Sequence, residues 1–399
     1  MSVDHSDARR NGGGALPLSG IRIADFSRLL PGPWCTQILG DLGAEIVKVE
    51  RPEGDPSRHN PPLYRSESAY FCGVNGNKTS LALDLTQAQD IGQAHRLIAS
   101  ADVLVESFAS GGTRKLGIDW ETARSLKPDL IYCSITGFGQ TGPLAHIAGH
   151  DLAIQAMTGM IGVGPDAVPA FQAADYAAAT MATIAILAAL RRRDQSGEGG
   201  YLDIAMFDSL FGMGNIALAS AMSRRAGGSG LPAMEVWGGN PRYAVYSTRD
   251  GRRVAVCLLE AKIWRAFCQA IDRTDLIFDE DPSARLSGHG ERSESFREAI
   301  ASFCLAHDRD EIGARMIALG LPVMPVLDPD EAVASENVEA RGLLQIITHP
   351  TEGPTLTIGS GLERTGVTRP QRSPAPAIGS AGDLSSIPAA GPAASAHQD

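Results

Sequence analysis

The sequence predicts an α/β fold in which a large domain built on a parallel sheet is followed by a smaller α+β domain. First, short apolar runs alternate with helix-like segments over residues 18–223, the pattern of a parallel sheet with crossover helices. Second, residues 224–240 are rich in glycine and lack any hydrophobic period, and beyond them the order of strands and helices changes. Third, a chain of 399 residues is long enough for more than one core.

The expected elements of the large domain follow from the period of the apolar residues. Strands are expected at 21–26, 44–49, 79–85, 103–106, 131–135 and 202–206, and the main helices at 34–42, 90–100, 151–160, 176–193 and 207–222. Gly43 suits the left-handed position that ends the first helix. The loop after the first strand has no G-x-G-x-x-G motif, so it gives no support for a dinucleotide site.

The second half predicts a smaller domain at residues 241–325. Runs at 243–246 and 254–259 predict a hairpin across Arg249-Asp250-Gly251, and helices are expected at 260–271, 294–307 and 310–319. A further helix is expected at 331–341, and 349–359 looks turn-rich. Residues 1–17 are predicted to be disordered, and 381–399, rich in Pro, Ala, Ser and Gly, to form a flexible tail.

Composition excludes several classes of protein. The net charge of −11 gives no general attraction to nucleic acid or to an anionic membrane, so any anionic ligand must meet local basic residues. The first residues lack an apolar core, and the longest apolar run, 177–190, is too short to span a bilayer. The six cysteines are scattered, which favours reduced thiols over disulfides or zinc. We therefore expect a soluble, cytoplasmic protein without nucleic-acid or membrane partners.

The stretch 131–176 carries the strongest functional signal. An apolar run is followed by a glycine-rich loop, then by the triplet Gly149-His150-Asp151 at a helix start, and finally by Asp175 ahead of a second helix. Open α/β sheets bind ligands at such strand-to-helix loops, and a helix start favours negative charge. A role of Asp175 in capping its helix is about as plausible as a catalytic one. For Glu260, between a strand and a helix, capping alone is the more common role.

These residues lie in longer blocks that resemble the family III CoA-transferase superfamily. The blocks LSGIRIADFSRLLPGPWCTQILGDLGAEIVKVERPEGDPSR, ADVLVESFASGGTRKLGID and SITGFGQTGPLAHIAGHD, with ADYAAATMATIAILAALRRRDQSGEGGYLDIAMFDS, recur in the order of that family over about residues 18–380. The resemblance implies a Rossmann-like large domain, a segment at 326–380 that returns to it from the small domain, and a homodimer of interlocked chains.

Within that superfamily the residues most resemble an α-methylacyl-CoA racemase, which inverts the α-carbon of a 2-methyl-branched acyl-CoA. The resemblance implies that His150 and Asp175 carry protons on opposite faces of the substrate, that Glu260 orients His150, and that the N–H of Asp151 stabilises the enolate. The alternative is a CoA-transferase in which Asp151 attacks the thioester to form an acyl-enzyme. The residues LAIQAMTG after the triplet favour that alternative.

The resemblance also implies where an acyl-CoA thioester binds. Arg51 and Lys115 are expected at the nucleotide end and Leu29 at the adenine. Lys78, a basic residue near a turn, and Gly149 are the other residues expected to bind the thioester. Taken alone, each basic residue is more often solvated than bound to phosphate. No separate cofactor is expected, because coenzyme A is part of the substrate.

Overall fold

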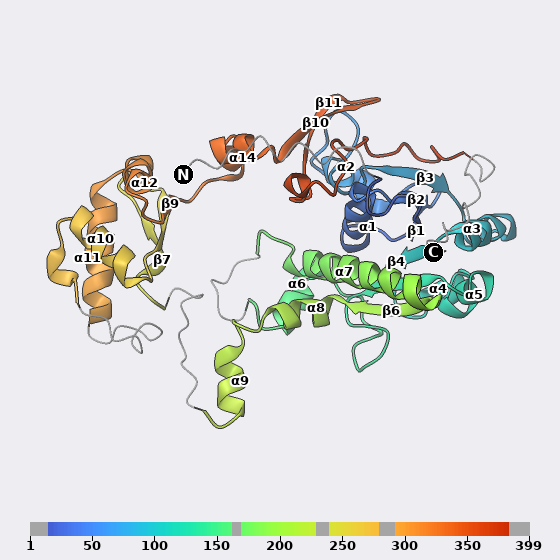
Figure 1. Ribbon diagram of the computed structural model, residues 1–399, viewed down its shortest axis with the longest axis horizontal. Coiled ribbons are helices and arrows are strands. Elements are labelled where there is room, and N and C mark those ends of the chain that lie inside the picture. The colour runs from blue at the N-terminus through green and yellow to red at the C-terminus, as the bar shows by residue number, and fades with distance from the viewer. Residues whose placement is uncertain (1–14, 162–168, 229–238, 279–291, 383–399) are drawn as a thin grey trace, which may run out of the picture. The chain divides into compact units, whose positions relative to one another are not determined.

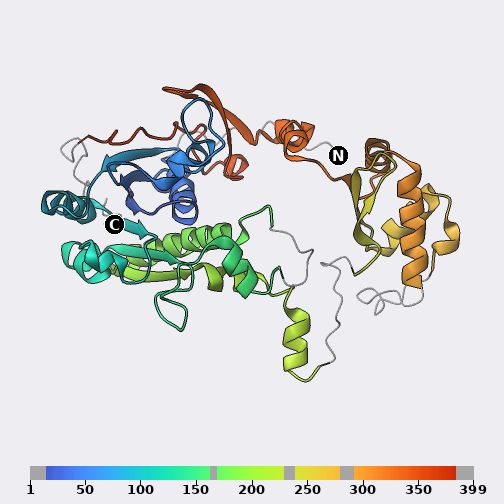
Figure 2. The same ribbon diagram turned by 180° about the vertical axis from the view of Figure 1, so that it is seen from behind.

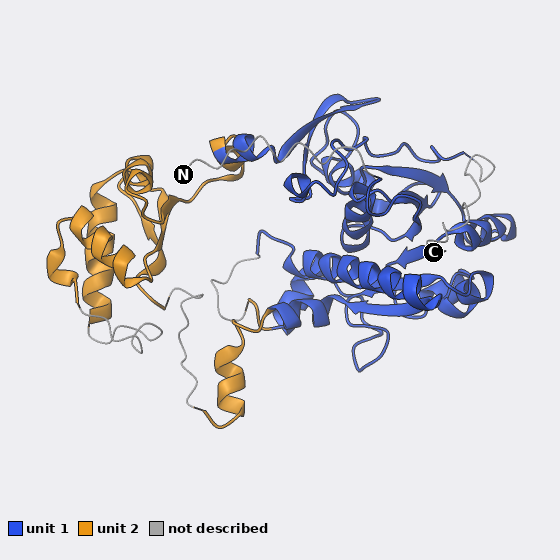
Figure 3. Cartoon of the chain, viewed as in Figure 1, with its two compact units in different colours: residues 1–158, 168–213, 337–399 blue, residues 159–167, 214–336 orange. Residues whose placement is uncertain are grey.

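The computed structural model describes residues 15–161, 169–228, 239–278 and 292–382, which form two compact units (Figure 3). Unit 1 comprises the described parts of residues 1–158, 168–213 and 337–399, and unit 2 those of 159–167 and 214–336. Most of the predicted disordered N-terminus, of the predicted linker and of the predicted tail lies outside the described residues.

Unit 1 is built on a six-stranded parallel sheet with the order β3-β2-β1-β4-β5-β6 (Figure 1). Its strands are β1 (Arg22–Phe26), β2 (Glu45–Glu50), β3 (Lys78–Ala82), β4 (Val103–Glu106), β5 (Ile131–Thr136) and β6 (Gly200–Ala205). All residues of β1, β4 and β5 are buried, as expected for strands covered on both faces. The predicted parallel α/β sheet is confirmed, and its order reverses between β1 and β4.

Helices cover both faces of this sheet. On one face, α3 (Ala88–Ser100) and α5 (Trp120–Leu126) share a core with β1 to β5 through residues such as Leu97 and Tyr132. On the other face, α1 (Pro31–Asp41) packs on β1, β2 and β4. The long helix α7 (Ala173–Ser196) contacts α1, β5 and β6 there, and it runs along β6 and α8 (Met206–Met213) in both views (Figures 1 and 2).

By length and composition α7 would also suit a membrane span. Half of its apolar window is buried inside the structure, and the helix contacts α1, α8 (Met206–Met213), β5 and β6. Its apolar residues are thus accounted for by the core of unit 1.

Shorter elements complete unit 1 around the sheet. They are η2 (Pro56–His59), α2 (Ala69–Val74), α4 (Gly112–Lys115), α6 (Asp151–Met157), η6 (Glu363–Thr365) and the antiparallel hairpin β10 (Leu344–His349) with β11 (Gly353–Ile358). Residues 349–359, predicted to be turn-rich, hold the turn at the tip of this hairpin and then β11, whose residues 353–358 alternate in burial as a strand does. Tyr64 fastens the loop before α2 to this hairpin by donating to the Leu356 carbonyl at 2.7 Å.

Unit 2 consists of an antiparallel sheet and helices. Strands β7 (Tyr243–Ser247), β8 (Arg253–Cys257) and β9 (Val323–Pro325) pair in that order, which confirms the predicted hairpin and adds an unpredicted third strand. Its helices are α9 (Ala219–Arg225), α10 (Ala261–Ala270), η4 (Thr274–Leu276), α11 (Arg292–Ala306), α12 (Arg309–Ala318) and α13 (Pro329–Val333).

The sequence predicts the core of unit 2 better than it predicts the segment that follows this core. Trp264, Phe267 and Phe296 form the core, as the apolar spacing of the predicted helices implies. The single helix predicted at 331–341 is wrong. Asp328 and Glu331 form a capping box that starts α13 at Pro329, and a separate helix, α14 (Glu336–Arg341), follows the break.

Candidate active site

Two cavities of unit 1 share residues that directly follow β1 and β4, the strands between which the sheet order reverses. The first has a volume of about 310 Å³ and the second about 590 Å³, and Arg28 and Phe108 line both. Arg28 lies two residues beyond β1 and Phe108 two beyond β4. Carboxyl ends of strands at such a reversal are where doubly wound sheets bind their ligands.

A buried network of charges fixes the loop after β1. Asp25 accepts hydrogen bonds from Ser27 and Thr36, and the ammonium of Lys78 lies 3.1 Å from its carboxylate. Burial alone would raise the pKa of Asp25, but Lys78 and Lys48 together with the two hydroxyls lower it to about 2. Lys48 in turn reaches the Ser27 carbonyl and the carboxylate of Asp55 at 2.9 Å each. The charges are therefore compensated pairwise, as burial requires.

This network gives Lys78 a different role from the predicted contact with CoA. Its ammonium donates to Asp25, to the Pro33 carbonyl and to the side chain of Asn75, all inside the protein. It lines neither cavity, and burial lowers its pKa to about 8 despite the attraction of Asp25.

The backbone between β1 and α1 is unusually constrained. Leu29 has φ +64°, a conformation that residues with a side chain rarely adopt, and its N–H donates to Asp55 at 3.4 Å. A side chain at Gly32 would collide with Ser27, because a Cβ there would lie 2.1 Å from the Cβ of Ser27. The tight turn brings Leu29 into the wall of the second cavity.

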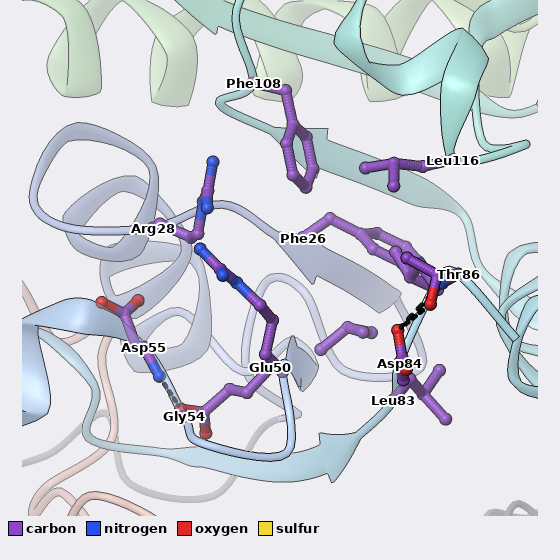
Figure 4. A pocket seen from close by; sticks show the side chains of 13 residues that line it. Phe26, Arg28, Glu50, Gly54, Asp55, Leu83, Asp84, Thr86, Phe108 and Leu116 are labelled. Carbon is purple, nitrogen blue, oxygen red and sulfur yellow. Dashed lines mark hydrogen bonds between the residues drawn. The ribbon is translucent and has the colours of Figure 1, made fainter.

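The first cavity combines apolar walls with two guanidinium groups (Figure 4). Phe26, Phe108 and Leu116 form part of the walls, with Arg28 beside the ring of Phe108, 4.7 Å from its centroid. Burial and the neighbouring Arg51 lower the pKa of Arg28. Among the residues that the structure describes, no carboxylate forms an ion pair with the Arg28 guanidinium. The cavity therefore suits a ligand with a flat apolar part and an anionic part.

Of the other predicted nucleotide contacts, Arg51 lines the first cavity and Lys115 lines neither. Lys115 is exposed at the last residue of α4, and its neighbour Leu116 reaches the first cavity instead. Leu29 lines the second cavity rather than the first.

The second cavity brings together residues from the starts of three helices. His150 precedes α6, Asp175 lies in the first turn of α7, and Tyr70 lies in the first turn of α2. Gly149 also lines it, and its backbone packs directly on that of Gly137, since a Cβ on either residue would lie within 2.7 Å of the other's Cα. Because Gly137 and Gly149 have no side chains, the loop after β5 can pack closely against the segment that carries His150.

Asp175 and Asp151 are neighbours with different environments. The Asp151 carboxylate accepts hydrogen bonds from the N–H of Ala174 and from the side chain of Gln155, both at 2.7 Å, and lines neither cavity. The Asp175 carboxyl lines the second cavity, and its pKa is raised to about 7 by burial and by the Asp151 carboxylate. A perturbed carboxyl in a cavity is typical of a reactive group.

Glu260 lies in unit 2, at the residue that precedes α10, and lines neither cavity. Its predicted hydrogen bond to His150 stays a prediction.

Sequence reasoning did not single out Arg28, Phe108 or Tyr70. Arg28 and Phe108 could have been found, because each comes two residues after a predicted strand of a parallel sheet. Tyr70 follows Ser68 in a stretch without a clear period, and nothing in the linear pattern links it to Asp175.

The sheet order and the cavities define a doubly wound α/β protein whose cavities lie at the switch point of the sheet and suit a partly apolar, anionic ligand. The model of CoA-transferase family III matches residues 18–381, so this chain belongs to that family. The succinate–glutarate CoA-transferase of Agrobacterium fabrum is 33% identical over 343 residues, which cover 82% of this chain and 84% of that protein.

A second relative agrees with this assignment, and a solved structure has a similar fold. The succinyl-CoA:mesaconate CoA-transferase of Haloarcula hispanica is 32% identical over 368 residues, 87% of this chain and 90% of that protein. The crystal structure of Rv3272 from M. tuberculosis superposes with a TM-score of 0.79 at 27% identity, covering 92% of this chain and 99% of that one.

The relatives overturn the prediction of a racemase. Both relatives named here are CoA-transferases, so the isomerase prediction is wrong and the alternative, CoA transfer, is the better interpretation. The triplet Gly149-His150-Asp151 misled the prediction, because a histidine beside an aspartate at a helix start does not specify which bond is made or broken.

Proposed function

We propose that this protein transfers coenzyme A from the thioester of one dicarboxylic acid to another dicarboxylic acid, with Asp175 as the nucleophile. The observation that carries the proposal is the position of Asp175, a carboxyl with a raised pKa in the wall of the second cavity. Membership of CoA-transferase family III supports the reaction class. The names of the relatives, which include succinate, glutarate and mesaconate, support dicarboxylic acids as substrates.

In the proposed reaction, a carboxylate oxygen of Asp175 attacks the carbonyl carbon of the bound acyl-CoA. The tetrahedral intermediate expels the CoA thiolate and leaves a mixed anhydride between Asp175 and the acyl group. The acceptor carboxylate then displaces the first acid at the aspartyl carbonyl. The thiolate attacks the new acyl carbon, which releases the new thioester and restores the Asp175 carboxylate, with no net change in protons or electrons.

The environment of Asp175 suits that role better than the environment of Asp151. Both oxygens of Asp151 accept hydrogen bonds, which lowers their nucleophilicity and fixes the carboxylate outside the cavity. Asp151 instead acts on its neighbour, because its charge helps to raise the pKa of Asp175. A more basic carboxylate is a stronger nucleophile once it has lost its proton.

The two cavities suit the two ends of an acyl-CoA. The apolar walls of the first cavity fit an adenine, and the guanidinium groups of Arg28 and Arg51 fit phosphate groups. Arg28 and Phe108 line both cavities, so a ligand that spans them would pass these two residues. The thioester would then lie in the second cavity beside Asp175, with His150 and Gly149 in the same wall. Lys115, at the end of α4 next to the first cavity, remains a proposed contact of the nucleotide.

We further propose that the protein forms a homodimer, that it is located in the cytoplasm, and that it needs no cofactor other than coenzyme A. Light scattering on the purified chain tests the first. The reaction as written needs only acyl exchange, so full activity after dialysis against a chelator is the expected result for the third.

The direct test is the conversion of succinyl-CoA and glutarate to glutaryl-CoA and succinate. Chromatography of the reaction mixture measures the glutaryl-CoA that is formed. We expect turnover by the unmodified protein and conversion of Asp175 to a hydroxamate when hydroxylamine is added together with succinyl-CoA. The Asp151→Asn variant is the matched control and should keep the adduct at Asp175. An adduct at Asp151 would contradict the assignment of the nucleophile, and no transfer among a panel of dicarboxylic acids would contradict the proposed function.

A further inference from the structure

Tyr70 is a second polar side chain that faces the reaction space and that the proposed reaction leaves unused. It lies in α2, is half-buried, and lines the second cavity together with Asp175 and His150. The start of α2 is held in place, because the Ser68 hydroxyl donates to the Asn60 carbonyl at 2.6 Å and accepts from the N–H of Phe71 at 3.2 Å.

Packing next to Tyr70 restricts the helix further. The neighbouring Phe71 is fully buried, and the guanidinium of Arg58 lies 3.7 Å from the centroid of its ring. Arg58 is itself bound to the buried carboxylate of Glu50 at 2.7 and 2.8 Å. Tyr70 is thus presented to the cavity from a rigid turn rather than from a loose loop.

The hydroxyl of Tyr70 differs from those of three other tyrosines. The hydroxyls of Tyr64, Tyr132 and Tyr246 each donate to a backbone carbonyl, of Leu356, Ile118 and Pro241 respectively. The Tyr70 hydroxyl has no hydrogen-bond partner among the residues that the structure describes, although the ring is half-buried. Tyrosine hydroxyls in partly buried positions usually have a partner, so this one is available to a ligand.

The electrostatic environment keeps this hydroxyl a donor. Burial raises the pKa of Tyr70 well above its usual range, and the carboxylates of Asp175 and Asp55 raise it further. The phenol therefore holds its proton throughout the range in which Asp175 titrates. The influence of Asp175 on Tyr70 also indicates that the two groups are close to each other in the cavity wall.

We propose that Tyr70 is a catalytic residue whose hydroxyl donates a hydrogen bond to the thioester carbonyl oxygen while Asp175 attacks the carbon. The inference rests on the proposed function. As the new C–O bond forms, the π electrons of the carbonyl move to its oxygen, and the Tyr70 O–H stabilises that charge without giving up its proton. When the C–S bond breaks, the carbonyl forms again and the thiolate leaves. A preorganised donor of this kind acts mainly on the transition state.

The test is the Tyr70→Phe variant, which removes one oxygen and keeps the ring. We expect kcat for the succinyl-CoA and glutarate reaction to fall by roughly 10- to 1,000-fold, with the KM for succinyl-CoA changed less than about threefold. The midpoint of the pH dependence should stay near that of the unmodified protein, and the Asp175 hydroxamate should still form, but more slowly. Tyr64→Phe is the matched control, since it removes a hydroxyl bonded to the β11 backbone, and it should leave kcat unchanged.

Other outcomes contradict this role specifically. If Tyr70→Phe keeps more than half of kcat, or raises KM alone, the hydroxyl does not act on the transition state. If it shifts the pH midpoint upward and keeps the plateau rate, the hydroxyl serves the Asp175 carboxylate instead. A normal melting temperature of the variant shows that folding is intact. If the unmodified protein transfers CoA and the variant equals it, only this inference falls; if the unmodified protein transfers none, the proposed function falls with it.

Discussion

Two buried sites in unit 1 show how the charge of a neighbouring residue changes the pKa of a carboxylate. In the cluster behind β1, Asp25 faces Lys78 and Lys48, and its pKa is lowered to about 2 although burial opposes this. At the start of α7, Asp175 is also largely withdrawn from water, but its charged neighbour is another carboxylate, Asp151, and its pKa is raised to about 7. The Asp25 carboxylate is therefore ionised at neutral pH, whereas the Asp175 carboxyl changes its charge near neutral pH.

The difference separates structural from reactive charges. The Asp25 cluster fixes the turn at Leu29 and the loop that follows β1. Its charges are paired with one another inside the protein and stabilise the fold. Asp175 is left without a basic partner among the described residues and faces a cavity, an arrangement that costs stability and keeps a nucleophile ready. Variants at the two clusters should therefore have opposite consequences.

The largest expected effect is the loss of activity in Asp175→Asn. Because an amide cannot form the anhydride, kcat should fall by about 10³-fold or more, equivalent to at least ~4 kcal/mol of transition-state stabilisation. Chromatographic measurement of glutaryl-CoA formation provides the readout. Asp25→Asn also removes a carboxylate, but it should act through folding, so the fraction that remains folded should keep an Asp175 hydroxamate. If folded Asp175→Asn retains its activity, Asp175 is not the nucleophile, and both carboxylates would then be structural.

The next largest effect is on folding. Lys78→Met should lower the free energy of unfolding by about 3–5 kcal/mol, because it leaves Asp25 buried without its closest cation. Denaturant unfolding followed by circular dichroism measures the change. The matched control is Lys127→Met, which breaks a half-buried surface pair with Asp129 and should cost about 0–1 kcal/mol. Equal losses in the two variants would contradict the structural role assigned to the buried pair.

The sequence predicts the scaffold better than it predicts these environments. The apolar runs of β1, β4 and β5 are long enough to identify a parallel sheet, and its helices follow from their apolar period. The β10–β11 hairpin was missed, because Pro350, Gly353 and Pro354 resemble a plain turn in the sequence.

The candidate site shows a sharper limit. His150 and Asp175 were found from their local context. No sequence pattern, however, predicts that the Asp151 carboxylate accepts a hydrogen bond from the N–H of Ala174 whereas Asp175 faces a cavity. That distinction depends on how α6 meets α7. Lys78 was expected at the nucleotide for the same reason: a lysine that follows a loop looks exposed until the sheet places Asp25 beside it.

A smaller effect concerns the pH dependence of the reaction. Asp175 attacks only when ionised, so kcat/KM should rise with pH through about 7 and lose roughly tenfold for each pH unit below it. Asp151→Asn removes the like charge next to Asp175, so the midpoint should move to lower pH, and the plateau at high pH should fall somewhat because a less basic carboxylate is a weaker nucleophile. Rates from pH 5 to 9 in both proteins give the readout. A midpoint that does not move would mean that burial alone sets the pKa of Asp175.

The smallest expected effect is a gain in stability when the reactive carboxyl is removed. The pKa of Asp175 is raised from its usual 3.8 to about 7 in the folded chain, so the folded state holds its proton more tightly than the unfolded state does. Stability from this group is therefore present below about pH 4, falls as the pH rises from there to about 7, and is lost above that. Asp175→Asn should accordingly raise the free energy of unfolding at pH 8 by ~0.5–2 kcal/mol and change it less at pH 4. Melting curves at the two pH values test this. A loss of stability at pH 8 would show that the Asp175 carboxylate, like that of Asp25, holds the fold together.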